Sequence, residues 1–207
     1  VVARRDAGGV GEPVLAAALA ALTGDIEQVP SAVSAVKVDG VRSYARVRAG
    51  TEVALAPRRV TVSRLDLRDR RGTDLDVTVT CSSGTYVRAL ARDLGEALGV
   101  GAHLTALRRT RSGPFDLSAA HDLAGLAADE QAVDRAVLPL ADAVAAAFPV
   151  RRLDDGEALA LSHGRRLAPT GTAATVGAFA PDGHCVALLE DREGAARPAV
   201  VFAPAGG

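Results

Sequence analysis

Tyr86 and Arg88 are the residues of this chain whose types and spacing most clearly suggest chemistry. The 207 residues contain only 2 tyrosines, and Tyr86 is one of them. A tyrosine offers an aromatic face for stacking, and an arginine beside a carboxylate keeps that carboxylate charged and oriented. If both residues lie on a strand, positions i and i+2 point to the same side. We therefore expect Tyr86 and Arg88 to face one pocket.

The elements around this pair follow from local patterning. Residues 75–81 alternate apolar and polar side chains, which predicts a strand. A tight turn at Gly84 follows it, and apolar residues at helical spacing then predict an amphipathic helix over 87–98. Gly99 and Gly101 end that helix. The pair therefore sits where a strand turns into a helix.

The rest of the chain predicts a mixture of helices and strands. We expect helices over 13–22, 43–49, 117–147 (broken near Pro139) and 153–161. We expect strands over 29–38, 59–67, 174–180, 185–189 and 199–203, and a short strand or extended piece over 104–112. Turns are expected at Asp39–Gly40, 68–73 and Pro181–Gly183, and Pro149 marks a domain boundary. The fold class is α+β.

The sequence around Tyr86 resembles a known family. Residues 81–95 read C-S-S-G-T-Y-V-R-A-L-A-R-D-L-G, and residues 101–109 read G-A-H-L-T-A-L-R-R. In this order and spacing the two segments resemble the TruB family of RNA-modifying pseudouridine synthases. Residues 24–37 are similar to that family's G-x-I-x-Q-x-P-P-x-Y-S-A-x-K stretch, although Val33 replaces the usual tyrosine.

The resemblance implies roles for six residues. It implies that Tyr86 lies against the target base and takes its proton, and that Arg88 pairs with a catalytic aspartate. Leu107 would form part of an apolar wall around the base. Lys37, Arg108 and Arg109 are candidates for contacts with RNA phosphates.

The nucleophile that this family uses is missing from the chain. The motif G-x-L-D-P-x-A-T-G, which carries the nucleophilic aspartate, does not occur in the sequence. Asp76 lies in a faint echo of the motif, but it begins an alternating strand, and the helical pattern places Asp93 away from the strand end. The chain also has no methionine. We therefore expect a fragment of a longer synthase, which would be inactive alone.

Composition indicates a globular chain and predicts no membrane-spanning segment. Hydrophobic residues make up 48% and charged residues 24%, which is typical of a globular chain. The sequence has no apolar run long enough to cross a membrane and no signal peptide. The net charge is −1, yet residues 37–71 hold ten basic and four acidic side chains, while 116–157 hold three basic and nine acidic. Phosphate binding depends on such local charge.

The resemblance to the TruB family implies one expectation, and two alternatives stay open beside it. Residues 1–147 would be the C-terminal portion of a pseudouridine synthase catalytic domain with a mixed, mainly antiparallel sheet. Residues 148–207 would be a small PUA-like, β-rich RNA-binding domain. The intact protein would isomerise a T-loop uridine of tRNA to pseudouridine as a cytoplasmic monomer, without cofactor or metal. The alternatives are a non-catalytic protein that binds or folds tRNA, and a domain unrelated to RNA.

Overall fold

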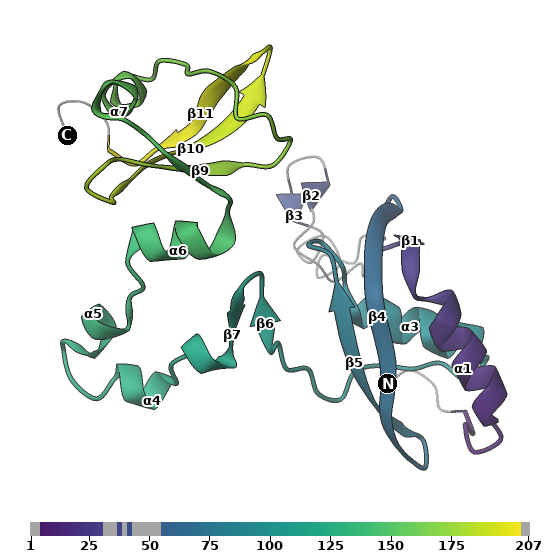
Figure 1. Cartoon of the computed structure of the whole chain (residues 1–207). Helices are drawn as coiled ribbons and strands as arrows, with labels where there is room; N and C mark the ends of the chain where they lie inside the picture. Colours follow the sequence, from purple (N-terminus) through teal and green to yellow (C-terminus); the bar gives the residue numbers. More distant parts are fainter. Residues whose placement is uncertain (1–4, 31–36, 39–40, 43–54, 204–207) are drawn as a thin grey trace. The chain divides into compact units, whose positions relative to one another are not determined.

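The chain is described here from a computed structural model, which covers residues 5–30, 37–38, 41–42 and 55–203. For residues 37–38 and 41–42 only the backbone is considered. The chain divides into two compact units, Val1–Leu107 and Arg108–Gly207. Figure 1 shows the elements of each unit.

The first unit is built on a three-stranded antiparallel sheet. Strand β4 (Arg58–Arg71) forms a hairpin with β5 (Asp74–Cys81), and β1 (Gly24–Gln28) pairs with the other edge of β4, so the order is β1-β4-β5. The predicted strand over 75–81 is confirmed. The predicted turn over 68–73 was too long, because β4 continues to Arg71 and Gly72, at φ +61°, makes the turn.

Two helices complete the core of this unit (Figure 1). Helix α1 (Glu12–Ala21) buries Leu15 and Leu19, and α3 (Val87–Ala97) adds Leu94 to the same cluster. Partly buried leucines from β4 and β5 pack against that cluster. The helices predicted over 13–22 and 87–98 are therefore confirmed within one or two residues.

A separate two-stranded ladder joins β2 (Lys37–Val38) to β3 (Val41–Arg42) in antiparallel pairing. The hairpin turn predicted at Asp39–Gly40 falls between these strands and lies outside the described residues. The helix predicted over 43–49 lies outside them as well. Of the strand predicted over 29–38, residues 31–36 also lie outside the described residues. Lys37–Val38 form β2, whereas residues 29–30 are not in a strand, because β1 ends at Gln28.

The second unit begins with short elements where one long helix was expected. A small hairpin, β6 (Arg111–Ser112) with β7 (Phe115–Asp116), precedes a 3₁₀ turn at Leu117–Ala119. Helices α4 (Leu123–Leu126), α5 (Ala132–Ala136) and α6 (Leu140–Ala147) follow. The break predicted near Pro139 is confirmed, because α5 ends at Ala136 and α6 begins at Leu140, but the helix predicted from 117 up to that break is wrong.

Local side chains explain why this segment breaks up. Asp116 accepts a hydrogen bond from the Ser118 N–H, and Asp122 accepts one from the Gly125 N–H, so each carboxylate starts a new turn. Alanine supplies helix propensity but little apolar area, and a helix in a protein is held chiefly by its buried face. Over 117–139 the only buried side chain is Ala132. The segment therefore lacks the continuous apolar stripe that one long helix would need.

The second unit ends in a four-stranded sheet of order β11-β10-β9-β8. Its strands are β8 (Val150–Arg152), β9 (Val176–Phe179), β10 (Cys185–Arg192) and β11 (Ala195–Val201), with β8 parallel to β9 and the other pairs antiparallel. The predicted hairpin across Pro181–Gly183 is confirmed, with Gly183 at φ +92°. Strand β8 was not predicted.

Helices cover this sheet. Helix α7 (Asp155–Ser162) begins where the Asp154 carboxylate accepts the Glu157 N–H at 2.7 Å, and its Leu161 enters the main core. Val144 of α6 packs against β9 and β10. The division into compact units falls at residue 108, and the boundary predicted between 147 and 148 stays a prediction.

Candidate active site

The candidate site is the junction between β5 and α3, where the backbone is tightly constrained. Strand β5 ends at Cys81, and the Ser82 N–H donates to the Thr61 carbonyl at 2.8 Å while the Thr61 N–H donates to Ser82 Oγ at 3.0 Å. The Thr85 hydroxyl donates to the Ser82 carbonyl at 2.9 Å. Gly84 has φ +82°, a conformation that other residues rarely adopt. The tight glycine turn predicted here is confirmed.

Tyr86 is the residue at which this turn becomes a helix. It has extended backbone angles, φ −99° and ψ 100°, and caps α3. Its carbonyl accepts the N–H groups of Ala89 and Leu90, at 2.9 and 3.1 Å, and so starts the helical hydrogen-bond ladder. Its N–H donates to the side-chain oxygen of Gln28 at 2.7 Å, and the Gln28 amide nitrogen donates to its carbonyl at 3.2 Å. The backbone of Tyr86 is thus fixed from two sides.

The sequence predicted that Arg88 and Tyr86 share one face of a strand, and the structure shows that they do not. It lies in the first turn of α3, where each residue advances about 100° around the helix axis. The strand rule for i and i+2 therefore does not apply to this pair. The junction still places the exposed Arg88 two residues after the half-buried Tyr86, in the first turn of the helix. Their joint role stays a prediction.

A second contact ties α3 to the end of β1. The guanidinium of Arg92 donates to the Val29 carbonyl at 2.9 Å and forms an ion pair with Asp93 at 2.6 Å. The Asp93 carboxylate is therefore paired with the adjacent arginine. Asp76, the other aspartate set aside on sequence grounds, pairs with Arg71 at 2.6 Å, and this hydrogen bond raises the pKa of Arg71.

The segment after α3 is held against the helix by two glycines. The Gly101 N–H donates to the Gly95 carbonyl at 2.9 Å, and a Cβ atom on Gly95 would lie 2.0 Å from the backbone nitrogen of Ala102. This close approach directs the chain from 101 toward Leu107, which is 66% exposed. The place of Leu107 in an apolar wall stays a prediction.

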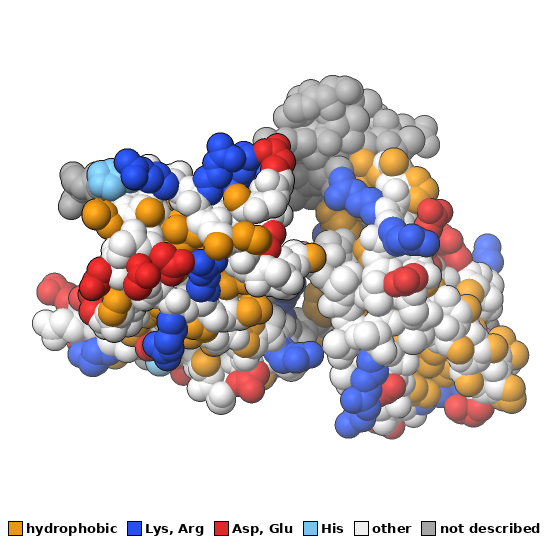
Figure 2. Space-filling model, turned by 45° about the horizontal axis from the view of Figure 1, so that its top comes forward, with side chains coloured by type: hydrophobic (Ala, Val, Ile, Leu, Met, Phe, Trp, Pro, Cys, Tyr) orange, Lys and Arg blue, Asp and Glu red, His pale blue; other side chains and the backbone are white. Residues whose placement is uncertain are grey.

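The proposed RNA-contacting residues are spread over the two units. Lys37 belongs to β2, while Arg108 and Arg109 are exposed at the start of the second unit. The structure therefore does not define a common site for them. Figure 2 shows small, separate groups of Lys and Arg side chains on the visible face. Several arginines of β4 are paired with acids, for example Arg64 with Asp66.

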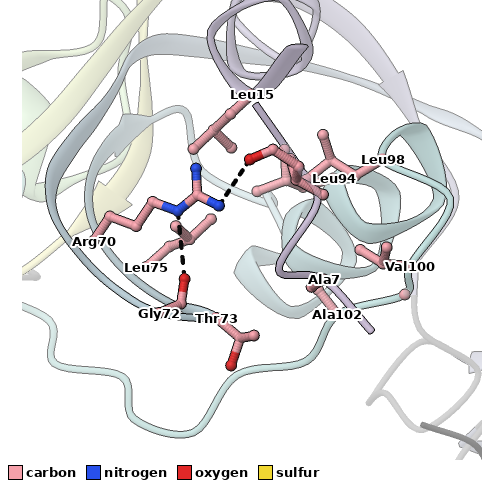
Figure 3. Close-up of a pocket in the computed structure, with 12 residues that line it drawn as sticks. Ala7, Leu15, Arg70, Gly72, Thr73, Leu75, Leu94, Leu98, Val100 and Ala102 are labelled. Carbon is pink, nitrogen blue, oxygen red and sulfur yellow. Dashed lines mark hydrogen bonds between the residues drawn. The ribbon is translucent and has the colours of Figure 1, made fainter. Parts of the chain in front are cut away.

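The pocket in Figure 3 is a different feature of the first unit. Apolar side chains of α1, α3 and the β4–β5 hairpin line it, among them Leu15 and Leu94. Arg70 points into it and donates hydrogen bonds to the backbone carbonyls of Val10 at 2.8 Å and Gly72 at 3.3 Å. Its guanidinium also pairs with the Glu12 carboxylate at 3.2 Å. Tyr86 is not among its lining residues, so this pocket is a packing feature and not the candidate site.

Gln28 was not singled out by the sequence, although a signal was present. In β1 the side chains of Ile26 and Gln28 fall on the same face, because residues two apart point to one side. A glutamine in line with an apolar residue is a polar group on the inward face. A buried amide at that position needs a hydrogen-bonding partner. Nothing in the sequence identified this partner as Tyr86, 58 residues away.

Solved structures share the fold of this chain. One is described as "Crystal Structure of a Cbf5-Nop10-Gar1 Complex", with a TM-score of 0.73 and 26% identity over 95% of this chain and 64% of that one. Another is described as "Structure of H/ACA RNP bound to a substrate RNA containing 2'-deoxyuridine", with a TM-score of 0.69 and 24% identity over 97% of this chain and 64% of that one. The second likeness shows the fold alone.

Family models and relatives cover nearly the whole chain. Residues 1–87 match "TruB family pseudouridylate synthase (N terminal domain)", 88–145 match "tRNA pseudouridylate synthase B C-terminal domain", and 148–203 match "tRNA Pseudouridine synthase II, C terminal". A tRNA pseudouridine synthase B of Thermobifida fusca is 54% identical over 97% of this chain and 69% of its own length. One of Arthrobacter is 52% identical over 99% and 70%.

This chain belongs to the TruB family of tRNA pseudouridine synthases, an isomerase family. It spans about two thirds of the length of the relatives described above. In the part of the chain that the structure describes, no helix is long and apolar enough to cross a membrane. The same residues contain no group of three or more His, Cys, Asp or Glu side chains arranged to hold a metal ion.

Proposed function

We propose that the protein to which this chain belongs isomerises a T-loop uridine of tRNA to pseudouridine, and that Tyr86 and Arg88 act in the reaction. The observation that carries the proposal is the rigid β5–α3 junction, which bears the G-T-Y-x-R signature of the family. The chain's identity of about one half with tRNA pseudouridine synthases supports the substrate class. In this proposal the protein acts in the cytoplasm as a monomer.

The chemistry sets what each residue must do. In the isomerisation the glycosidic bond breaks, the base turns and a carbon–carbon bond forms. The base carbon loses its proton, and the base nitrogen released from the sugar gains one from water. Substrate and product have the same atoms, so no redox step is required. Tyr86 stacks against the base, which must leave the RNA stack, and takes the proton. Arg88 keeps the nucleophilic aspartate ionised through a charge-assisted hydrogen bond.

The aspartate itself is not assigned to this chain. The motif that carries it in the family does not occur among the 207 residues. Asp76 and Asp93 are paired with neighbouring arginines in the first unit. In our proposal Arg88 therefore acts on an aspartate that these residues do not contain. Leu107 closes the apolar side of the base pocket, and Lys37, Arg108 and Arg109 contact RNA phosphates.

Tritium release tests the proposal. A T-arm stem–loop RNA with tritium on uridine C5 loses the label to water when the new carbon–carbon bond forms. We would compare this chain with a chimera in which it replaces the matching part of the Thermobifida fusca relative, using that relative as the positive control. We expect release by the chimera, and by the chain alone only RNA binding that weakens as salt rises.

Other outcomes separate the alternatives. Tritium release by the 207 residues alone would overturn the proposal that the nucleophile lies elsewhere. A chimera that binds the RNA and releases nothing, beside an active relative, would favour a non-catalytic tRNA-binding protein. A chain with no more affinity for the T arm than other proteins of similar charge would argue against any RNA function.

A further inference from the structure

The first unit buries one amide side chain at the candidate site. Gln28 is 1% exposed, and it is the only buried polar or charged side chain among the described residues. Moving an amide out of water costs free energy unless its groups find hydrogen-bonding partners. A lone buried amide in a core of leucine, valine and alanine therefore needs specific partners.

Gln28 uses both ends of its amide on a single residue. Its side-chain oxygen accepts the Tyr86 N–H at 2.7 Å, and its nitrogen donates to the Tyr86 carbonyl at 3.2 Å. A neighbouring strand makes the same two bonds to one residue in an antiparallel ladder. The amide thus replaces a strand partner at a point where β5 has ended and α3 has not begun.

This contact transmits the rigidity of the sheet to Tyr86. Gln28 is the last residue of β1, where it pairs with Arg58 of β4, and two residues earlier Ile26 pairs with the buried Val60. The N–H and carbonyl of Tyr86 together set the direction of its Cα–Cβ bond. Arg92 adds a second link through the Val29 carbonyl. Three hydrogen bonds therefore fix Tyr86 and α3 to the last residue of β1 and to Val29, which follows it.

We propose that Gln28 is a positioning residue for Tyr86: its side-chain amide holds the tyrosine backbone in the orientation that the isomerisation needs. This inference rests on the function proposed above. Gln28 does not touch the base in this account and acts only through Tyr86. Small errors in the placement of a reacting group cost about 10²-fold in rate, so the effect falls on turnover more than on RNA binding.

The test removes the amide and keeps the shape. Gln28→Met preserves chain length and approximate volume but cannot make the two hydrogen bonds. In the isotope-labelled 207-residue chain, we expect the Tyr86 backbone amide to exchange with solvent at least about tenfold faster, while the Val62 amide of β4 is unaffected. In the chimera we expect kcat to fall by about 10²-fold and KM for the RNA to change less than about threefold.

The matched control separates positioning from loss of stability. Leu19→Ala removes buried contacts of α1 in the same unit and leaves the junction untouched. An equal fall in kcat for Leu19→Ala at equal loss of melting temperature would overturn the positioning role. An unchanged kcat in a folded Gln28→Met chimera would overturn it as well.

The unaltered chain provides a test that does not depend on the variant folding. The Gln28 side-chain amide and the Tyr86 backbone amide must both exchange slowly, and fast exchange of either beside a protected Val62 would refute the contact. An inactive unaltered chimera with a protected Tyr86 amide would count against the proposed function, and with it against any role for Gln28 in the reaction. The two failures are therefore distinguishable.

Discussion

The two units of this protein use their buried positions differently. The second unit buries eight apolar residues in its main cluster beneath a four-stranded sheet, with Leu161 and Leu189 fully enclosed. Among its described residues, the first unit buries four in its main cluster, beside a three-stranded sheet. It also buries Gln28, which contacts Tyr86.

This difference separates stability from positioning. Apolar burial stabilises a fold without specifying one backbone direction, whereas a satisfied buried amide constrains one residue at a cost in desolvation. In the second unit the polar contacts close loops near the surface, as Asp191 does by accepting the N–H groups of Thr170 and Gly171, each at 2.8 Å. The described part of the first unit thus combines apolar burial with one buried amide that constrains the Tyr86 backbone.

The largest expected effect on stability is in the second unit. Leu189 is fully buried, so Leu189→Ala should lower the free energy of unfolding by about 2–5 kcal/mol through lost burial and an unfilled cavity. Urea unfolding measures the change, and amide exchange assigns it to β9–β11. The same substitution at Leu159, which is 62% exposed, should cost less than about 0.5 kcal/mol. Equal costs at the two leucines would contradict the account of this core.

The next effect should appear in turnover alone. Arg88→Met in the chimera removes the cation proposed to hold the nucleophile and should lower kcat by about 10²–10³-fold. Because Arg88 is exposed, the melting temperature should hardly change. Arg64→Met, on an exposed arginine of β4, is the matched control and should leave kcat unaltered. Similar losses for both variants would mean that general charge, and not Arg88, matters.

A smaller effect should come from the close approach beside α3. A Cβ atom at Gly95 would lie 2.0 Å from the Ala102 nitrogen, so Gly95→Ala must displace the 101–107 segment and should cost about 1–3 kcal/mol. Gly156→Ala in α7 meets only the Asp154 carboxylate oxygen at 3.3 Å and should cost less. Thermal unfolding of both variants checks this. A stabilised Gly95→Ala chain would show that the segment is not held against α3.

The smallest effect concerns acid stability of the second unit. The Thr170 N–H is the main cause of the lowered pKa of Asp191, with a further contribution from Gly171. A carboxyl group with a lowered folded-state pKa stabilises the fold above its unfolded value of about 3.9, and this contribution disappears as pH falls through the folded pKa. Asp191→Asn should therefore flatten the fall in melting temperature at acid pH. An unchanged acid slope in the variant would exclude this role.

The sequence predicted the fold best where patterns were regular. The alternating 75–81 stretch and the apolar spacing after Tyr86 located β5 and α3 well, because each pattern reflects one buried face. The alanine-rich 117–147 segment has propensity without such a face, and its aspartates start new turns. Strand β8 has only three residues and escaped notice.

The candidate site was predicted in its residues but not in its geometry. Residue types and spacing located Tyr86 and Arg88, yet the helix begins at Val87, between them, so the two residues do not share a strand face. The contact of Gln28 with Tyr86 joins residues 58 apart, and the pairing of β1 with β4 and of β4 with β5 brings them together. No local pattern carries that information.

The central claim is that a rigidly held Tyr86 takes part in the chemistry on the base. The most direct test is Tyr86→Phe in the chimera, with T-arm RNA binding and tritium release measured on the same samples. Phenylalanine keeps the stacking face and removes the hydroxyl, so we predict unchanged binding and a loss of release of about 10²–10⁴-fold. Release at the unaltered rate would contradict the account.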